Sequence, residues 1–294
     1  MNQKTVARRV EAVGIGLHKG VPVSLALEPM QGGSGIVFYR KDTGTTIPAR
    51  PENVVDTKMA TVIGKDGVVV STIEHLLSAI AGNGIDNVRV ILDNDEVPIM
   101  DGSSASFCMM IDEAGIAEVE APKQVMVIKK PVEVRDGDKF VRLTPSDRVE
   151  FRYEISFDHP VIADQQYHVT LTPQSYREEI ARARTFGFLK EVQYLRSIGL
   201  ARGGSLENAI VLDDKKILNQ EGLRYDDEFV RHKILDAIGD MSLLGMPFVG
   251  IYEAFAGSHH LNHVLTKKIL EDASNYEIVT ITPQQEKVFE PVFA

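Results

Sequence analysis

One stretch, residues 228–245, limits most strongly how this chain can fold. Its apolar residues recur every three to four positions, which predicts one amphipathic helix with a face packed against a core. Three polar side chains, His232, Asp236 and Asp240, interrupt this pattern at steps of four residues. Because an α-helix turns by ~100° per residue, steps of four stack these side chains on one side. The spacing therefore predicts a polar stripe along the helix.

The stripe has two interpretations. An imidazole and a carboxylate at positions i and i+4, as in His232 and Asp236, form a two-pronged ligand pair for a divalent metal, above all zinc. Alternatively, the aspartates are solvated and the histidine is an ordinary core or surface residue. On this helix alone the second interpretation is favoured, since such clusters are only probabilistic signs of a site. A third ligand from elsewhere in the chain would reverse that preference.

Composition restricts the class of protein. With 294 residues the chain is long for one core, so we expect two domains, residues 1–123 and 124–294. A net charge of −10 argues against a nucleic-acid partner, which usually needs a basic face. The single cysteine, Cys108, excludes a disulfide framework and fits a reducing compartment.

The chain also lacks the patterns of export and membrane insertion. It has no charged-then-apolar signal at its start and no run approaching the ~20 apolar residues of a membrane span. We therefore expect a cytoplasmic protein that makes at most peripheral contact with a membrane.

Alternation and helical spacing predict sheets layered with helices in both halves of the chain. Strands are expected at residues 21–27, 35–39, 68–70, 87–92, 125–128, 131–135, 140–145, 150–157 and 248–255. Further helices are expected at residues 71–82, 105–114, 175–183 and from about 262 to 273. Residues 75–80 resemble 233–238, and the order of elements is similar in the two halves. We therefore expect an α+β fold of two similar domains, with a site in the cleft between them.

A histidine in the first half completes a possible metal site. His75, with His232 and Asp236, supplies the three protein ligands of a catalytic zinc, whose fourth position is left for water. Glu74, adjacent to His75, is then a candidate general base. The alternative for Glu74 is a capping box with Ser71 at a helix start, and the two interpretations stand about even.

A second catalytic group is expected in the histidine-rich turn that contains His259. As an imidazolium, His259 would stabilise an oxyanion or protonate a leaving amine, and Asp240 would hold it protonated. The alternative is that His259, like His260 and His263, has no role. Lys233, on the long helix, can neutralise a phosphate, although most helix lysines only face solvent.

The strings around these residues resemble one enzyme family. They are GIGLHKG, STIEHLLSAIAG, GIDNV, IMDGSSASF, RARTFGF, LENAIVL, GLRYDDEFVRHKILDAIGDMSLLG and SHHLN. In order from Ile15 to beyond Asn262, they resemble the UDP-3-O-acyl-N-acetylglucosamine deacetylases, zinc amidases that commit bacteria to lipid A synthesis. Other members often carry a proline where this chain has Ser106, and a cysteine near residues 56–60. Neither difference touches the three expected ligands.

The resemblance implies a reaction and the residues at its centre. A UDP-linked, 3-O-acylated N-acetylglucosamine is the implied substrate, and its 2-acetamido group loses acetate. One zinc ion per chain, bound by His75, His232 and Asp236, lies between two α+β sandwich domains. Glu74 is the implied general base, and either Glu74 or His259 protonates the departing amine.

The resemblance also implies the surrounding groups. Asp240 keeps His259 charged, and Thr185 polarises the scissile carbonyl. Lys233 contacts the substrate phosphate, and Phe157 lies under the uracil. The implied passage for the acyl chain is lined by Leu189, Val192, Ala201 and Val211.

Two other functions are compatible with the residues. A related metal-dependent amidohydrolase acting on another acylated sugar would share the metal chemistry and lack the acyl passage. A catalytically silent two-domain binding module would use its histidines structurally and hold no tightly bound zinc. We favour the deacetylase, and we expect it to be a monomer.

Overall fold

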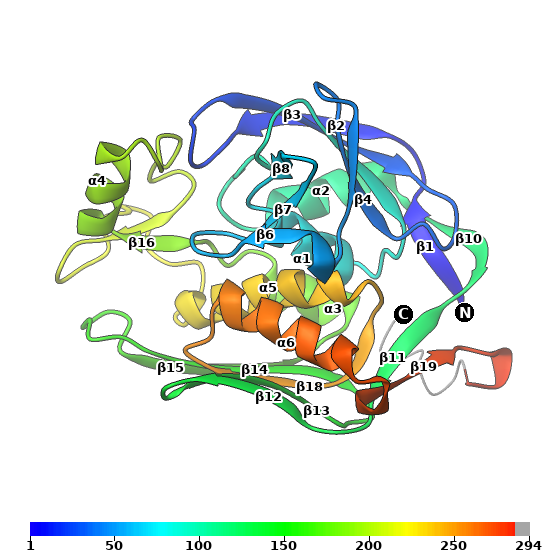
Figure 1. Ribbon diagram of the computed structural model, residues 1–294. Helices are drawn as coiled ribbons and strands as arrows, with labels where there is room; N and C mark the ends of the chain where they lie inside the picture. The colour runs from blue at the N-terminus through cyan, green and yellow to red at the C-terminus, as the bar shows by residue number, and fades with distance from the viewer. Residues whose placement is uncertain (286–294) are drawn as a thin grey trace.

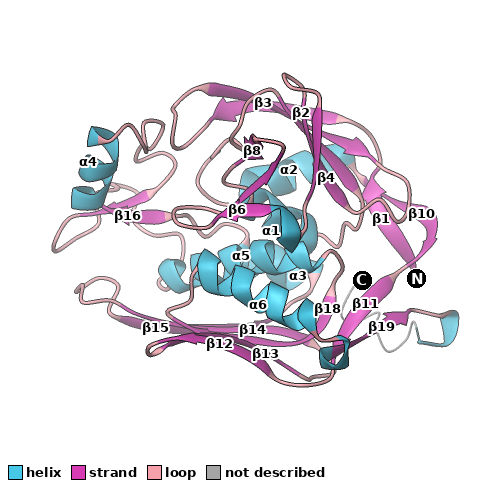
Figure 2. Cartoon of the chain, in the orientation of Figure 1, coloured by secondary structure: helices cyan, strands magenta, loops and turns pink. Residues whose placement is uncertain are grey.

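The computed structural model describes residues 1–285 and has a layered α+β architecture (Figures 1 and 2). An upper sheet and a lower sheet form the outside, and the main helices lie between them. The α+β class with a sheet and helices in each half is therefore confirmed. The domain boundary near residue 123 stays a prediction. Within residues 1–285, no helix has the length and apolar character needed to cross a membrane.

The first half of the chain builds the upper layer in Figure 1. Its main sheet has the order β2 (Val10–Ile15), β3 (Pro22–Pro29), β9 (Val88–Leu92), β4 (Ile36–Arg40) and β5 (Thr45–Pro48). Smaller sheets pair β1 (Asn2–Val6) with β10 (Ile116–Pro122), and join β6 (Val54–Asp56), β7 (Val62–Lys65) and β8 (Val68–Val70). The helices are η1 (Pro51–Asn53), α1 (Glu74–Gly82) and α2 (Ala105–Ala114).

The second half builds the lower layer. Its sheet runs β12 (Val132–Asp136), β13 (Lys139–Thr144), β18 (Phe248–Phe255), β11 (Gln124–Ile128) and β19 (Tyr276–Thr280); β14 (Val149–Ser156) pairs with β18 and β15 (Asp164–Thr170). The helices are α3 (Pro173–Ser175), η2 (Tyr176–Ile180), α4 (Leu189–Ser197), α5 (Glu228–Met241), η3 (Ser242–Leu244), α6 (His259–Glu271) and η4 (Ala273–Asn275). The short strands β16 (Phe186–Phe188) and β17 (Ile210–Leu212) pair in parallel, and with α4 they project from the body (Figure 1).

Helix α5 is the central element because it is buried on almost every side. All of its residues are buried except Arg231 and Lys233, which are half-buried. It packs against α1, and a glycine makes the contact close: a Cβ at Gly239 would lie 2.0 Å from the carbonyl oxygen of Glu74. The expectation of solvated aspartates on this helix was therefore wrong, since Asp236 and Asp240 face the interior.

Three expected helix boundaries were wrong for local reasons. Helix α1 begins at Glu74 rather than residue 71, and its N-cap Ile73 has no side-chain cap, so Ser71 forms no capping box. The helix expected at 175–183 is the short α3 followed by the π-helical turn η2. Helix α6 begins at His259, three residues before the expected start, because the hydroxyl of Ser258 accepts a hydrogen bond from the Leu261 amide. Helix α4 was not predicted, and neither were the strands β1, β2, β5, β6, β7, β10, β15, β16, β17 and β19.

Candidate metal centre and active site

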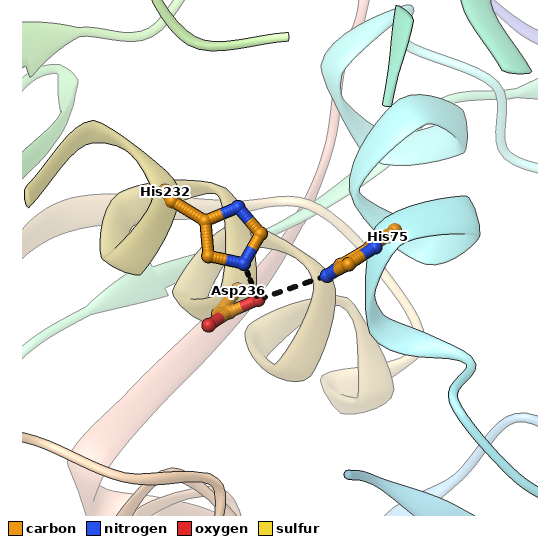
Figure 3. Close-up of side chains that lie close together, drawn as sticks. All are labelled: His75, His232 and Asp236. Atoms are coloured by element: carbon orange, nitrogen blue, oxygen red, sulfur yellow. Dashed lines mark ion pairs between the residues drawn. The ribbon is translucent and has the colours of Figure 1, made fainter. Parts of the chain in front are cut away.

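The structure brings His75, His232 and Asp236 together between the two layers (Figure 3). His75 lies in the first turn of α1, and the other two lie one turn apart on α5. The Nε2 atoms of His75 and His232 lie 3.5 Å and 3.3 Å from the same Asp236 oxygen, Oδ1. All three residues are at least 95% buried. Two histidines and a carboxylate are one of the ligand sets of catalytic zinc.

Two of the three separations between ligand atoms fit a tetrahedral ion. Bonds of about 2.1 Å in that geometry separate neighbouring ligand atoms by roughly 3.4 Å, close to the two separations from Asp236 Oδ1. That oxygen is also buried without a hydrogen-bond partner within residues 1–285. Because a buried polar atom without a partner is costly, an ion held by His75, His232 and Asp236 would remove the penalty.

The protonation state of His232 suits metal binding. Burial lowers its pKa to about 3, so the ring is neutral at pH 7. Its Nδ1 lies 3.0 Å from the carbonyl oxygen of Ala183, which can only accept, so the proton is assigned to Nδ1. The Nε2 lone pair therefore faces Asp236. Although burial opposes ionisation, neighbouring groups, including the Lys233 ammonium 3.1 Å away, hold the pKa of Asp236 well below its usual range.

The segment that orients His232 is fixed by a buried ion pair. Arg184 follows Ala183, and its Nε donates to Glu228 Oε1 over 2.9 Å. Glu228 is the first residue of α5, so the pair joins the segment to the helix that carries His232. Sequence reasoning missed both residues. The motif strings contained them, and no spacing rule connects positions 44 residues apart.

Glu74, His259 and Asp240 form a chain of polar contacts beside the three ligands. The Nδ1 of His259 lies 2.8 Å from Asp240 Oδ2, and its Nε2 lies 3.7 Å from Glu74 Oε1. Burial alone lowers the pKa of His259, but the carboxylates of Asp240 and Glu74 outweigh it and raise the pKa to about 10. Burial raises the pKa of Glu74. The imidazole of His259 is therefore charged at pH 7.

Asp240 is itself fixed by two further hydrogen bonds. The hydroxyl of Thr61 donates to Oδ1, and the amide of Asn262 donates to Oδ2 over 2.9 Å. The backbone N–H of Thr61 also donates to Glu74 Oε2 over 3.1 Å. Thr61 thus holds both carboxylates that contact His259, a role that no sequence motif suggested.

The remaining candidates are Thr185, Lys233 and Phe157. The Thr185 backbone is held by Gly102 and Ile210, and its hydroxyl has no hydrogen-bond partner within residues 1–285. Lys233 lies over the ring of Phe186, with its Nζ 5.8 Å from the centroid. Phe157 also packs on Phe186, with a centroid separation of 5.9 Å.

The residues expected to line an acyl passage all belong to the projecting segment of β16, α4 and β17. Leu189 and Val192 are half-buried on α4, and Ala201 and Val211 are buried. The side chain of Val192 approaches Gly187 of β16, since a Cβ on that glycine would lie 3.5 Å from Val192 Cγ2. Their role as a passage stays a prediction.

Comparison with known proteins identifies the family. The profile of the UDP-3-O-acyl N-acetylglycosamine deacetylase family matches residues 3–271. The chain belongs to this family. The stretch matched by the deacetylase profile contains all three candidate ligands together with Glu74 and His259.

Curated relatives carry the corresponding name, UDP-3-O-acyl-N-acetylglucosamine deacetylase. The protein of a Nitratiruptor species is 69% identical over 279 residues, which cover 95% of this chain and 94% of the relative. The proteins of Nautilia profundicola and Campylobacter jejuni are 66% and 60% identical over 294 residues, covering the whole of each pair of chains. The similarity to these deacetylases therefore extends over both halves of the fold.

Proposed function

We propose that this protein is a zinc-dependent amidase that hydrolyses the acetamide of UDP-3-O-acyl-N-acetylglucosamine and releases acetate, the committed step of lipid A biosynthesis. The observation that carries the amidase chemistry is the meeting of His75, His232 and Asp236 in a buried group. The names of the relatives support the substrate.

The chain's own groups can manage the protons of amide hydrolysis. When bound, zinc supplies a Lewis acid for the amide carbonyl and lowers the pKa of water towards ~7. Glu74, adjacent to a ligand, accepts the proton of the attacking water. Burial raises the pKa of its carboxyl, which suits a group that takes a proton and gives it up again. The proton ends on the leaving amine, and the C–N bond breaks as acetate forms.

His259 and Thr185 supply positive charge and a donor for the developing oxyanion. The His259 imidazolium is kept charged by Asp240 and lies 3.7 Å from Glu74. A fixed charge of this kind, away from water, stabilises a transition state strongly. Because the two groups are so close, either Glu74 or His259 can deliver the proton to the amine.

Further residues are proposed to bind the rest of the substrate. Lys233, whose side chain is 27% exposed, is proposed to contact a phosphate. Phe157, packed on the ring of Phe186, is proposed to stack on the uracil. The segment of β16, α4 and β17 would take the acyl chain along Leu189, Val192, Ala201 and Val211.

Two measurements test the proposal. Purified protein should hold about one zinc per chain, and His232→Gln should lose most of it while folding normally. Glu74→Gln should retain zinc and lose acetate release by about 10²-fold or more. The matched control is His260→Gln, which removes an exposed imidazole next to His259 and should change neither zinc content nor rate.

Contrary results would point to the other two functions. A chain without zinc, equally stable after His232→Gln, would be a binding module. A zinc enzyme that works equally well on a sugar without the 3-O-acyl chain would be a different amidohydrolase.

A further inference from the structure

A cavity of about 200 Å³ lies at the C-terminal ends of α1 and α5. Its wall contains Ala81 and Gly82 at the end of α1, and Ile238, Met241 and Ser242 at the end of α5. None of the candidate ligands or catalytic residues lines it. The cavity is therefore a separate site, bordered by the same two helices that carry the candidate metal ligands.

Most of the cavity wall is apolar. Ile36 of β4 contributes from the first half of the chain, and Val149 and Phe151 of β14 and Phe248 of β18 contribute from the second. The last three are buried side chains of the core. Ligand pockets commonly combine such a wall with a few placed polar groups.

One cation in this wall is not matched by an acidic side chain among the described residues. The Arg50 guanidinium lies against two glycines of the wall: a Cβ at Gly245 would lie 1.5 Å from Nη1, and a Cβ at Gly35 would lie 3.9 Å from Nη2. Its Nη1 donates to the Leu244 carbonyl over 3.2 Å. Within residues 1–285, no carboxylate pairs with Arg50.

The acidic residue in the same wall is already paired. Both oxygens of Asp86 accept hydrogen bonds from the buried Lys123 ammonium, over 2.7 and 2.9 Å. Asp86 is therefore engaged with another cation. Among the described residues, the Leu244 carbonyl is the only acceptor for the five N–H donors of Arg50. A guanidinium suits a carboxylate, which it can bind through two parallel hydrogen bonds.

We propose that this cavity binds a small amphipathic monocarboxylate. Its carboxylate pairs with Arg50, and its alkyl chain lies along Ile36, Val149 and Phe151. The volume of about 200 Å³ is many times what one water needs, which leaves room for a short alkyl chain, and we take a six-carbon acid as the probe. The ligand contacts the ends of both α1 and α5. Because it binds the folded state and not the unfolded state, it stabilises the folded protein by mass action.

Hexanoate is the probe for this site, with hexan-1-ol and hexylammonium as ligands of equal length. On the full-length protein as purified, titration calorimetry should give one saturable hexanoate site, and the melting temperature should rise with hexanoate concentration. Arg50→Gln should weaken hexanoate at least tenfold, because a charge-assisted pair is lost. Hexan-1-ol should bind at least tenfold more weakly than hexanoate, and hexylammonium should not bind.

Two further variants keep the test decisive. Arg148→Gln removes an exposed arginine next to the lining residue Val149 and should leave hexanoate binding unchanged. Ile36→Phe reduces the volume of the cavity, retains Arg50 and should also abolish hexanoate binding. The site is therefore tested even if Arg50→Gln does not fold.

Four results would overturn the proposal. Hexanoate affinity that is unaffected by both Arg50→Gln and Ile36→Phe would place the ligand elsewhere, and its loss in His232→Gln would assign the carboxylate to the metal centre. Equal affinity for hexan-1-ol would make the occupant an uncharged apolar molecule. If the chain self-associates and hexanoate dissociates the complex, the cavity would be assigned to a second copy of the chain. None of these results bears on deacetylation, which is tested by zinc content and acetate release.

Discussion

Removing the charge of Glu228 tests how the site is held together. Its carboxylate is fully buried, and its partner Arg184 is 2% exposed. Oε1 accepts from the backbone N–H and the Nε of Arg184, both over 2.9 Å. Oε2 accepts from the backbone N–H of Arg224 over 2.6 Å and from Arg184 Nη2 over 3.2 Å. One side chain therefore satisfies four donors.

The substitution Glu228→Gln keeps the shape and removes both the charge and half of the acceptors. The amide nitrogen would face two N–H donors in place of one carboxylate oxygen, and Arg184 would remain as a buried cation. Breaking a buried pair by removing one partner typically costs about 3–5 kcal/mol of unfolding free energy. We therefore expect a loss of that size.

Glu221→Gln provides the matched control. Glu221 pairs with the same guanidinium over 2.8 Å, but its side chain is 57% exposed. An exposed pair of this kind contributes about 0–1 kcal/mol. Both variants replace a carboxylate partner of Arg184 with an amide. The difference between their unfolding free energies therefore measures the effect of burial.

Urea unfolding followed by circular dichroism measures both variants, and zinc content measures the effect on the site. Since Arg184 follows Ala183, whose carbonyl orients His232, we also expect Glu228→Gln to retain less zinc than wild type. If Glu228→Gln unfolds within about 1 kcal/mol of wild type, or if Glu221→Gln costs as much, the reasoning from the buried pair is refuted.

Three further predictions concern the same centre. Asp240→Asn should lower the pKa of His259 from about 10, observable by imidazole NMR titration; an unchanged pKa would remove Asp240 as its cause. In metal-free protein, His232 has a pKa of about 3 against 6.5 unfolded, so its contribution to stability is complete above pH 6.5 and is lost towards pH 3. Between about pH 7 and 4.5, unfolding free energy should fall by about 2–3 kcal/mol more than in His232→Gln; parallel curves would contradict this. Gly239→Ala should cost about 1–3 kcal/mol by overpacking against Glu74, whereas Gly187→Ala, with only ordinary contacts, should be near neutral in thermal unfolding.

Periodic elements were predictable because their patterns are local. The helix at residues 105–114 and the strands at 68–70 and 248–255 have the expected bounds. The helix at 175–183 failed because its backbone changes from a short α-helix to a π-helical turn. Over a single turn, hydrophobic spacing does not distinguish these two geometries, in which each amide donates to the carbonyl four or five residues earlier.

Glu74 shows how a local signal can mislead. The spacing from Ser71 suggested a capping box, and in the structure the carboxylate turns away from its own helix end to accept from Thr61. Thr61, Arg184 and Glu228 lie on segments whose relative positions depend on the packing of the whole chain. Their roles were therefore inaccessible from residue spacing.

The sequence by itself determined the chemical components: an imidazole and a carboxylate one turn apart, a further histidine on another helix, and alternation that builds sheets in both halves. Only the tertiary structure decided that His75 meets the other two, that Asp240 contacts His259, and that Arg50 borders a cavity without a carboxylate partner among the described residues. The physical reason is that helical spacing sets distances within one element. Separations between elements follow from how α1 packs on α5, where a missing Cβ at Gly239 allows the close approach.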